Sequence, residues 1–210
     1  MSGGAWRTDL LVVRHGQSTW NSESRFTGQV DVPLSELGQA QAEDLARRCA
    51  YLSIDAVITS DLKRANVTGR TVSEALGLPQ PAQLSLLRER WSSTLQGLPR
   101  DEIEARYPGQ LAAWAEAREI DLPGENEPYA QFADRVVRGL VSAARYGERV
   151  LVVAHAGVFV VLDQLAGTVG AGGVRNAAGR MVHVSGDDAL LVGQDLDLAD
   201  EHLRSGHRDP

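Results

Sequence analysis

Three short stretches of the chain consist mainly of apolar residues, at 9–13, 56–59 and 150–154. They are rich in Val, Ile and Leu and are shorter than an ordinary helix. Continuous apolar strands are typical of parallel sheets, because helices cover both faces of such a sheet. The pattern therefore predicts three buried strands of a mostly parallel sheet.

Helical periodicity fills the intervals between these strands. Apolar residues recur three or four positions apart over 36–50, 61–76 and 129–146, and a further helix is expected directly after His155. The segment 101–119 predicts one or two shorter helices with a break at 107–109. Near the end of the chain, 181–185 and 189–192 predict two antiparallel strands joined by a turn.

The alternation of strand and helix is typical of a three-layer α/β/α sandwich with a mostly parallel central sheet. No internal repeat and no long linker divides the 210 residues, so residues 1–194 are expected to form a single domain. Residues 195–210 are mainly polar and are predicted to be a frayed tail. His202 and His207 in this tail are therefore expected to be solvated rather than to bind a metal.

The charge of the chain restricts its partners. The formal net charge is −7, whereas nucleic acids and anionic membranes bind basic surfaces, so neither is expected as a partner. Of the 21 basic residues 20 are Arg, and Lys63 is the single Lys. Recognition of a small anion would therefore depend on Arg and His. The sequence leaves open whether the chain forms a homodimer.

The single cysteine, Cys49, excludes an intramolecular disulfide and a cysteine-based zinc cluster. It falls within the apolar pattern of 36–50, which favours a buried and unreactive thiol. The first residues carry no secretory signal pattern, and no apolar stretch is long enough to span a membrane. These features predict a soluble, cytoplasmic protein.

Side chains that can bind or attack a phosphate group follow the predicted strands. Arg14, His15 and Gly16 end the first strand, Ser60 ends the second, and His155 follows the third. Ligands of open α/β sheets bind beyond the carboxyl ends of the strands. Neutral imidazole is a good nucleophile near neutral pH, and guanidinium groups pair with phosphate oxygens. The sequence therefore predicts an anion site with a histidine nucleophile at this edge of the sheet.

Each of these residues also has a simpler interpretation. Arg14 and His15 could be a solvated arginine and a capping histidine at a strand end. Ser60 is expected to cap the next helix, which puts Arg64 about one turn into that helix, where a surface arginine is common. His155 could be a hydrogen-bonded histidine at a strand end. The coincidence of two histidines and two arginines at one sheet edge favours a catalytic site.

Six stretches of the chain occur in the order known from one family. They are RHGQSTWN (14–21), RFTGQVDVPLSELGQAQA (25–42), SDLKRANVT (60–68), LLRERWSSTLQG (86–97), PGEN (123–126) and VVAHAGV (152–158). With them the chain resembles the histidine phosphatase superfamily, in the branch of cofactor-dependent phosphoglycerate mutase and its smaller phosphatase relatives. The resemblance covers most of residues 8–160 and implies a phosphoglycerate mutase-like fold.

The resemblance also implies roles for individual residues. His15 would be the nucleophile that takes the phosphoryl group, and Glu89 would be the general acid and base. Arg14, Arg64 and His155 would surround the transferring phosphate. The implied substrate-binding residues are Ser18, Asn21, Thr27, Gly28, Trp91 and Ser92. Substrate specificity is further expected from 98–128 and 175–176.

Phosphoryl transfer depends mainly on positioning and on stabilising charge at the phosphoryl oxygens. Two guanidinium groups and a histidine can do this without a metal ion, and the sequence has no carboxylate cluster with metal-ligand spacing. Neither a metal nor a cofactor is therefore expected. Glu89 is chosen through the resemblance alone, because its local sequence favours it no more than Glu102 or Glu125.

The expected activity is hydrolysis of a small phosphorylated metabolite, and mutase-type phosphoryl transfer is the alternative. Mutases of this branch carry an adjacent arginine pair after the region that matches Glu89, whereas 108–128 contains only Arg118. They also tend to have Gly-Asn after the second histidine, where this chain has Ala-Gly-Val at 156–158. The close match over 15–42 keeps the mutase alternative open. A third alternative, a catalytically silent binding protein, would be expected to have lost a residue such as His15.

Overall fold

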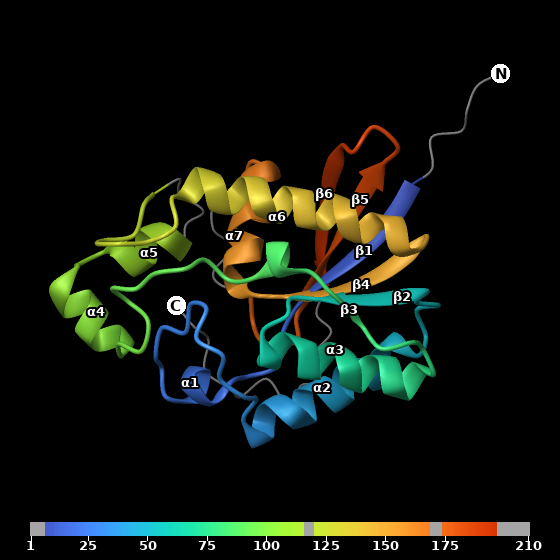
Figure 1. The fold of residues 1–210 in the computed structure, drawn as a ribbon, viewed down its shortest axis with the longest axis horizontal. Helices are drawn as coiled ribbons and strands as arrows, with labels where there is room; N and C mark the ends of the chain where they lie inside the picture. The colour runs from blue at the N-terminus through green and yellow to red at the C-terminus, as the bar shows by residue number, and fades with distance from the viewer. Residues whose placement is uncertain (1–6, 116–119, 169–173, 197–210) are drawn as a thin grey trace.

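The centre of the protein is one six-stranded sheet. The computed structural model describes residues 7–115, 120–168 and 174–196, and Figure 1 shows their fold. The strands are β1 (Arg7–Arg14), β2 (Ala56–Thr59), β3 (Ala82–Gln83), β4 (Arg149–Ala154), β5 (Gly179–Ser185) and β6 (Leu190–Leu196). They lie in the order β3-β2-β4-β1-β5-β6. The first four in that order pair in parallel, and β5 and β6 pair antiparallel, so the predicted mostly parallel sheet is confirmed.

Helices cover both faces of the sheet (Figure 1). On one face lie α2 (Glu36–Cys49) and α3 (Lys63–Leu76), and on the other lie α6 (Tyr129–Ala143) and α7 (Ala156–Leu165). The shorter elements are α1 (Thr19–Ser22), α4 (Arg100–Arg106), α5 (Gln110–Ala115) and the 3-10 turns η1 (Ser85–Leu87) and η2 (Ala144–Tyr146). The three-layer α/β/α sandwich predicted from the sequence is confirmed.

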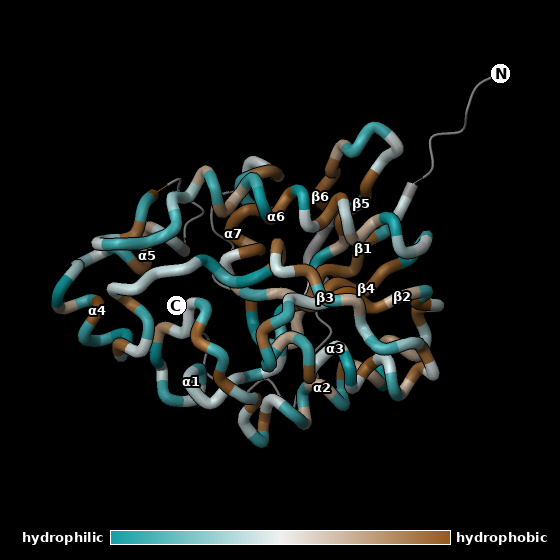
Figure 2. Tube along the Cα trace, viewed as in Figure 1, coloured by the Kyte–Doolittle hydropathy of each residue, from teal (hydrophilic) through white to brown (hydrophobic). Residues whose placement is uncertain are grey.

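The apolar run of β1 supplies both layers of the core. Leu10 and Val12 pack in the cluster that includes α6 and α7, whereas Leu11 and Val13 pack in the cluster that includes α2 and α3. Successive side chains of a strand point to opposite faces of the sheet. A strand covered on both faces therefore needs apolar residues at every position, and Figure 2 shows the hydrophobic colour concentrated in the central strands.

A third and smaller core holds the segment that contains α4 and α5. Leu95, Ile103, Leu111 and Leu122 are buried against one another there. In Figure 1 these two helices lie beyond one end of the sheet, outside the two main helical layers. The break predicted at 107–109 separates α4 from α5.

The predicted start of α3 is wrong by two residues. The helix begins at Lys63, and Leu62 rather than Ser60 occupies the capping position. The Ser60 hydroxyl accepts the backbone N–H of Leu62 at 3.3 Å, and Asp31, from a distant segment, accepts the backbone N–H of Lys63 at 2.7 Å. Arg64 consequently lies in the first turn of α3, closer to the start of the helix than predicted.

The predicted polar tail begins too early. Asp195 and Leu196 belong to β6 and pair with Arg180 and Gly179 of β5. The rest of that segment, with His202 and His207, lies outside the described residues.

Cys49 is buried, as predicted, and burial raises the pKa of its thiol to about 12. A thiol of this kind stays protonated at neutral pH and is a poor nucleophile. Among the helices of the described residues, none combines the length and the apolar character needed to cross a membrane. A cytoplasmic location stays a prediction.

Candidate active site

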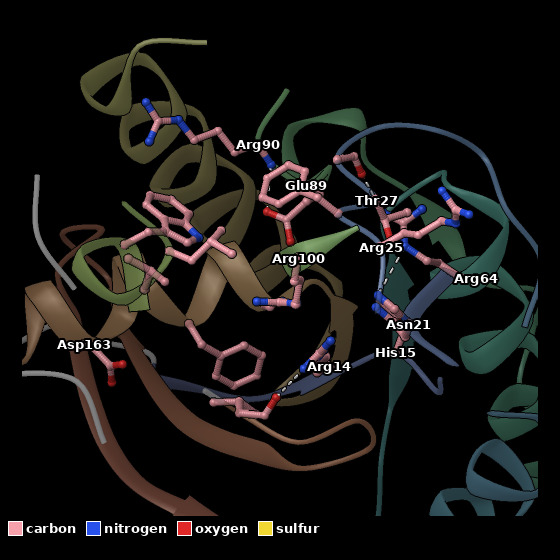
Figure 3. A pocket seen from close by; sticks show the side chains of 18 residues that line it. Arg14, His15, Asn21, Arg25, Thr27, Arg64, Glu89, Arg90, Arg100 and Asp163 are labelled. Carbon is pink, nitrogen blue, oxygen red and sulfur yellow. Dashed lines mark hydrogen bonds between the residues drawn. The ribbon is translucent and has the colours of Figure 1, made fainter. Parts of the chain in front are cut away.

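A cavity lies beyond the carboxyl end of β1, bordered by the first turns of α3 and α7. Figure 3 shows Arg14, His15, Glu89 and Arg100 turned toward a common space, whereas Arg90 and Asp163 are turned away from it. Of the residues predicted for the site, those that line it are Arg14, His15, Asn21, Thr27, Gly28, Arg64 and Glu89, whereas His155 lies outside the lining. The other lining residues are Arg25, Phe26, Arg90, Arg100, Leu111, Trp114, Ala156, Phe159, Val160, Asp163 and Val174.

His15 is oriented by its neighbour along the chain. Its Nδ1 lies 2.6 Å from the carbonyl oxygen of Gly16, so Nδ1 carries the proton and donates it. Its Nε2 accepts a hydrogen bond from Nε of Arg64 at 3.2 Å, which requires a lone pair on Nε2. Burial, followed by the charges of Arg64 and Arg14, lowers the pKa of His15 well below 6.5. The imidazole is therefore neutral at neutral pH and can act as a nucleophile through Nε2.

The turn after β1 depends on two glycines that face each other. A Cβ on Gly16 would lie 2.4 Å from the Gly38 carbonyl oxygen, and a Cβ on Gly38 would lie 1.9 Å from the Gln17 carbonyl oxygen. Glycine at both positions lets the loop pass against the start of α2. The Gly16 N–H also donates to the Thr68 hydroxyl at 3.1 Å. This packing holds His15 at the end of the sheet.

Arg14 and Arg64 bring two buried guanidinium groups to the same end of the cavity. Arg14 donates to the Val174 carbonyl at 2.7 Å. Arg64 is only 1% exposed and donates to the carbonyls of Gly28 and Val30 at 2.7 and 2.9 Å. Burial lowers the pKa of Arg64 to about 10, which leaves it charged at neutral pH. Two like charges buried together favour the binding of an anion between them.

His155 follows β4 and is fully buried. Its ring centroid lies 5.1 Å from that of His15, at an interplanar angle of 62°. Within the described part of the chain, neither ring nitrogen of His155 has a hydrogen-bond partner. Burial is the main cause that lowers its pKa well below 6.5, and Arg64 adds to this. A buried polar group of this kind is costly unless a ligand or water supplies the partner.

Glu89 reaches the cavity from the segment after η1. Its Oε1 accepts the backbone N–H of Arg90 at 2.7 Å, and its Oε2 accepts that of Gly157 at 3.1 Å. Gly157 lies in the first turn of α7, where exposed N–H groups favour a carboxylate. A Cβ on Gly157 would lie 2.1 Å from Oε1 of Glu89, so glycine makes this approach possible.

At the other end of the cavity, Arg100, Leu111 and Trp114 come from the segment 98–128 in which specificity was expected, although the sequence did not single out these individual residues. Trp114 and Leu111 come from α5, Phe159 comes from α7, and Arg100 of α4 adds positive charge. Arg25 also lines the cavity, but its guanidinium pairs with Glu23 at 2.8 Å. Phe159 and Asp163 follow His155 at intervals of one helical turn, and this spacing is the signal that could have identified them. Asp163 forms an ion pair with Arg180, which compensates its charge.

Three predicted substrate-binding residues do not line the cavity. Ser18 is buried and caps α1, where its hydroxyl accepts the Asn21 N–H at 3.1 Å. Ser92 is buried and its hydroxyl accepts the Leu95 N–H at 3.2 Å. Trp91 is held by Glu127, which accepts its backbone N–H at 3.3 Å. These three residues shape local backbone structure, whereas Asn21, Thr27 and Gly28 line the cavity as predicted.

The region around 175–176, predicted to affect specificity, contacts the backbone of His15. The Asn176 side chain donates to the backbone carbonyl of His15 at 2.8 Å. Its neighbour Val174 lines the cavity. Nowhere in 7–115, 120–168 and 174–196 are three or more His, Cys, Asp or Glu side chains grouped so that they could hold a metal ion.

Comparison with known proteins agrees with this geometry. The model of the histidine phosphatase superfamily (branch 1) matches residues 10–185. A metal-independent phosphoserine phosphatase of Arabidopsis thaliana is 34% identical over 203 residues, which cover 94% of this chain and 84% of the relative. A 2,3-bisphosphoglycerate-dependent phosphoglycerate mutase of a Methylobacterium species is 34% identical over 168 residues, or 74% of this chain and 81% of the relative.

A solved structure with this fold is that of mycobacterial glucosyl-3-phosphoglycerate phosphatase. It is 30% identical in sequence to this chain and superposes with a TM-score of 0.71. The match covers 90% of this chain and 97% of the solved one.

Proposed function

The chain belongs to the histidine phosphatase superfamily (branch 1) and is a phosphatase, and on this premise we propose that it hydrolyses a small phosphomonoester through a phosphohistidine on His15. The observation that carries the proposal is the environment of His15. Its neutral ring directs the Nε2 lone pair toward the buried guanidinium of Arg64, and the ring of a second buried histidine, His155, lies 5.1 Å away between centroids.

In the first step, the phosphate group of the substrate binds between Arg14, Arg64 and His155. Guanidinium N–H groups donate to the phosphoryl oxygens, and an N–H of His155 gains the partner that it otherwise lacks. The Nε–H of Arg64 transfers its hydrogen bond from Nε2 of His15 to a phosphoryl oxygen, which frees the lone pair on Nε2. Nε2 then forms a bond to phosphorus while the ester P–O bond breaks. The leaving oxygen takes the proton of the Glu89 carboxyl, which leaves a free alcohol, a carboxylate and a phosphohistidine.

In the second step, water replaces the alcohol. The Glu89 carboxylate takes one proton from the water while the water oxygen bonds to phosphorus. The P–N bond breaks, its electron pair returns to Nε2 of His15, and inorganic phosphate leaves. The hydrogen bond from Nδ1 to Gly16 keeps the same nitrogen available for the next cycle.

Glu89 has to be protonated for the first step. Each of its oxygens accepts one backbone N–H, so a second lone pair remains on each oxygen for a proton. The negative charge of a bound phosphate favours the protonated carboxyl. The approach of substrate therefore helps to prepare the acid that the reaction needs.

The end of the cavity formed by Arg100, Leu111, Trp114 and Phe159 is called the alcohol end here, because the alcohol part of the substrate would occupy it. Its residues favour a substrate with a second anionic group. Arg100 contributes positive charge there, and Phe26, Trp114 and Phe159 contribute apolar surface. Phosphoserine, named for the plant relative, and glucosyl-3-phosphoglycerate, named for the mycobacterial structure, both have this chemistry.

A substrate panel tests the proposed function. Phosphoserine, glucosyl-3-phosphoglycerate, 3-phosphoglycerate, sugar phosphates, nucleoside monophosphates and p-nitrophenyl phosphate are assayed for release of inorganic phosphate. We expect release from several of them, with the anionic substrates preferred by kcat/KM. No release from any member of the panel at any substrate concentration would contradict the proposal.

Mutase activity is the second candidate, and the similarity to the Methylobacterium mutase favours it. A mutase returns the phosphoryl group of His15 to the bound substrate instead of to water. Incubation with 3-phosphoglycerate separates the two, because a phosphatase releases phosphate whereas a mutase produces 2-phosphoglycerate. We expect phosphate release to exceed isomerisation.

A further inference from the structure

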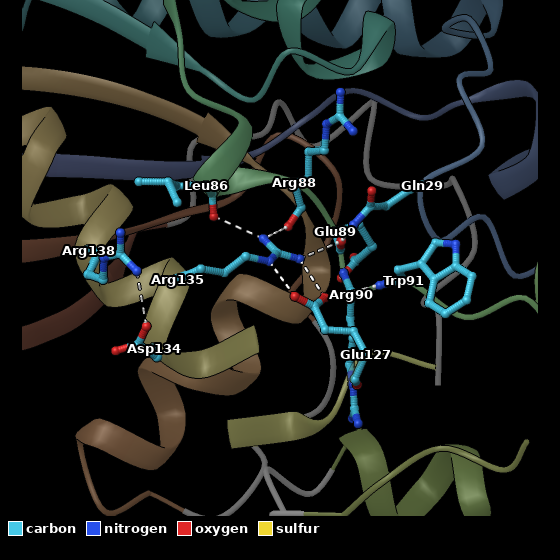
Figure 4. A network of polar contacts seen from close by, with 10 residues as sticks. All are labelled: Gln29, Leu86, Arg88, Glu89, Arg90, Trp91, Glu127, Asp134, Arg135 and Arg138. Atoms are coloured by element: carbon cyan, nitrogen blue, oxygen red, sulfur yellow. Dashed lines mark hydrogen bonds and ion pairs between the residues drawn. The ribbon is translucent and has the colours of Figure 1, made fainter. Parts of the chain in front are cut away.

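Arg135 of α6 lies outside the cavity lining and makes an extensive set of contacts with the segment that carries Glu89. Its guanidinium donates to the backbone carbonyls of Leu86, Arg88 and Glu89 at 2.9, 2.6 and 2.9 Å. It also donates to both carboxylate oxygens of Glu127 at 2.6 and 2.7 Å. Figure 4 shows this guanidinium between the backbone of the segment and Glu127.

Glu127 holds the same segment on its other side. Its carboxylate accepts the backbone N–H of Trp91 at 3.3 Å, and its own backbone N–H donates to the Trp91 carbonyl at 3.0 Å. The buried guanidinium of Arg90 donates to the Glu127 carbonyl at 2.8 Å. The backbone before and after Glu89 is therefore tied to the ion pair of Arg135 and Glu127.

This ion pair is well placed to fix backbone geometry. Both side chains are 15% exposed, so water competes weakly for their hydrogen bonds. A guanidinium has its five N–H donors in one rigid plane, and here the plane bridges three carbonyls and a carboxylate. Small shifts of Glu127 or Arg135 would therefore move the backbone at Glu89.

The position of the Glu89 carboxyl depends on that backbone. Its two oxygens are held by the N–H groups of Arg90 and Gly157. The first N–H belongs to the segment that Arg135 holds, and the second belongs to α7. A shift of the segment relative to α7 would break one bond or the other, and a general acid works only when it lies within hydrogen-bond reach of the leaving oxygen.

We propose that Arg135 and Glu127 are positioning residues for the general acid: together they hold the 86–91 backbone so that the Glu89 carboxyl lies against the first turn of α7. This inference rests on the proposed role of Glu89. Neither residue touches the reacting atoms, and each acts on the reaction through Glu89.

The proposal predicts an effect that depends on the leaving group. An alkyl phosphate such as phosphoserine releases a strongly basic alkoxide and needs a proton from Glu89. In contrast, p-nitrophenyl phosphate releases a weakly basic phenolate and needs that proton far less. Misplacement of Glu89 should therefore slow the first substrate much more than the second, whereas general loss of structure should slow both equally.

The experiment compares Arg135→Met, Arg135→Lys and Glu127→Gln with wild type on these two substrates. Glu89→Gln serves as the reference for loss of the acid, and Arg138→Met is the matched control. Arg138 is on the same helix, is 66% exposed, and pairs with Asp134 on the surface. We expect Glu89→Gln to lower kcat for phosphoserine by about 10²-fold or more beyond its effect on p-nitrophenyl phosphate.

Arg135→Met is expected to lower kcat for phosphoserine by about tenfold or more beyond its effect on kcat for p-nitrophenyl phosphate. The KM values are expected to change little. Arg135→Lys keeps the charge and is expected to recover part of the loss, and Arg138→Met is expected to match wild type. Equal loss on both substrates, or no loss, would overturn the positioning role. If Arg135→Met does not fold, Arg135→Lys and Glu127→Gln are judged by the same criterion.

The same data separate the two proposals. A Glu89→Gln variant without leaving-group selectivity would overturn the acid role of Glu89 itself. Another outcome is that Glu89→Gln slows phosphoserine more than p-nitrophenyl phosphate, whereas Arg135→Lys and Glu127→Gln slow both substrates equally. This outcome would leave the acid role of Glu89 intact and overturn only the inference about the ion pair.

Discussion

The phosphate end and the alcohol end of the cavity differ in how the fold supports them. At the phosphate end, Arg14 and His15 follow β1, His155 follows β4, and Arg64 opens the helix after β2. These three strands are neighbours in the sheet, and the side chains of all four residues are almost completely buried. Their positions are consequently tied to the central core of the protein.

The alcohol end rests on a different part of the molecule. Arg100, Leu111 and Trp114 come from α4 and α5, which pack around a small separate core. In Figure 1 these helices lie beyond the end of the sheet. Trp114 also packs against the main core beside Phe132, but α4 and α5 lie outside the two helical layers that cover the sheet. We therefore expect the sheet to determine the chemistry at the phosphate end and the α4–α5 segment to affect which phosphoester is accepted.

The largest effect should come from Arg64 at the phosphate end. Arg64→Met removes a buried guanidinium that would stabilise the phosphoryl oxygens, and we expect kcat/KM to fall by about 10³-fold. Every substrate binds through its phosphate, so the loss should be similar across the substrate panel. Arg47→Met, at an exposed position on α2, is the control and should match wild type. A fall of kcat/KM for only one class of substrate would contradict the assignment of Arg64 to phosphate binding and of substrate choice to the alcohol end.

The buried histidines should make stability depend on pH. Burial lowers the pKa of His15 and His155 well below 6.5 in the folded protein. Below that pH the unfolded chain binds more protons than the folded chain, so the free energy of unfolding should fall as the pH drops. The slope is about 1.4 kcal/mol per pH unit for each histidine, and it continues until the folded-state pKa values are reached.

Urea unfolding between about pH 7.5 and about pH 5.5 measures this slope. His155→Asn removes one of the two groups and should flatten the dependence relative to wild type. An identical slope in the variant would show that His155 takes up a proton as readily in the folded protein as in the unfolded chain, contrary to its burial at the phosphate end.

The smallest and most selective effect should come from Arg100 at the alcohol end. Arg100→Met should raise KM for phosphoserine and 3-phosphoglycerate by about tenfold, because one charge-assisted hydrogen bond is lost. The KM for p-nitrophenyl phosphate should change little. Arg106→Met, on the exposed side of the same helix, is the matched control. Equal changes for all three substrates would place Arg100 outside the specificity region.

The same contrast explains what the sequence could predict. Apolar runs identified β1, β2 and β4, and the carboxyl ends of parallel strands share one edge. That rule was enough to bring Arg14, His15 and His155 together, as observed. The start of α3 was wrong because its first N–H is bound by Asp31, whose position depends on tertiary structure.

At the alcohol end the sequence predicted a segment, 98–128, but the individual lining residues could not be identified from local patterns. Trp114 and Phe26 reach the cavity from segments far apart in the chain, and nothing in their own sequence marks them as lining residues. Glu89 was found through the family resemblance, because its hydrogen bond to Gly157 spans 68 positions. Trp91 and Ser92 adjoin Glu89 in sequence, yet they lie outside the cavity lining because their backbone pairs with 126–127.

Trapping of the phosphoenzyme tests the central claim most directly. Wild-type protein is mixed with a substrate from the panel, quenched under alkaline conditions that preserve phosphohistidine, and analysed by mass spectrometry of its peptides. The account predicts a single phosphoryl group on His15, and none after the same treatment of His15→Ala. Phosphate release by the wild type without modification of His15, or undiminished release by His15→Ala, would contradict it.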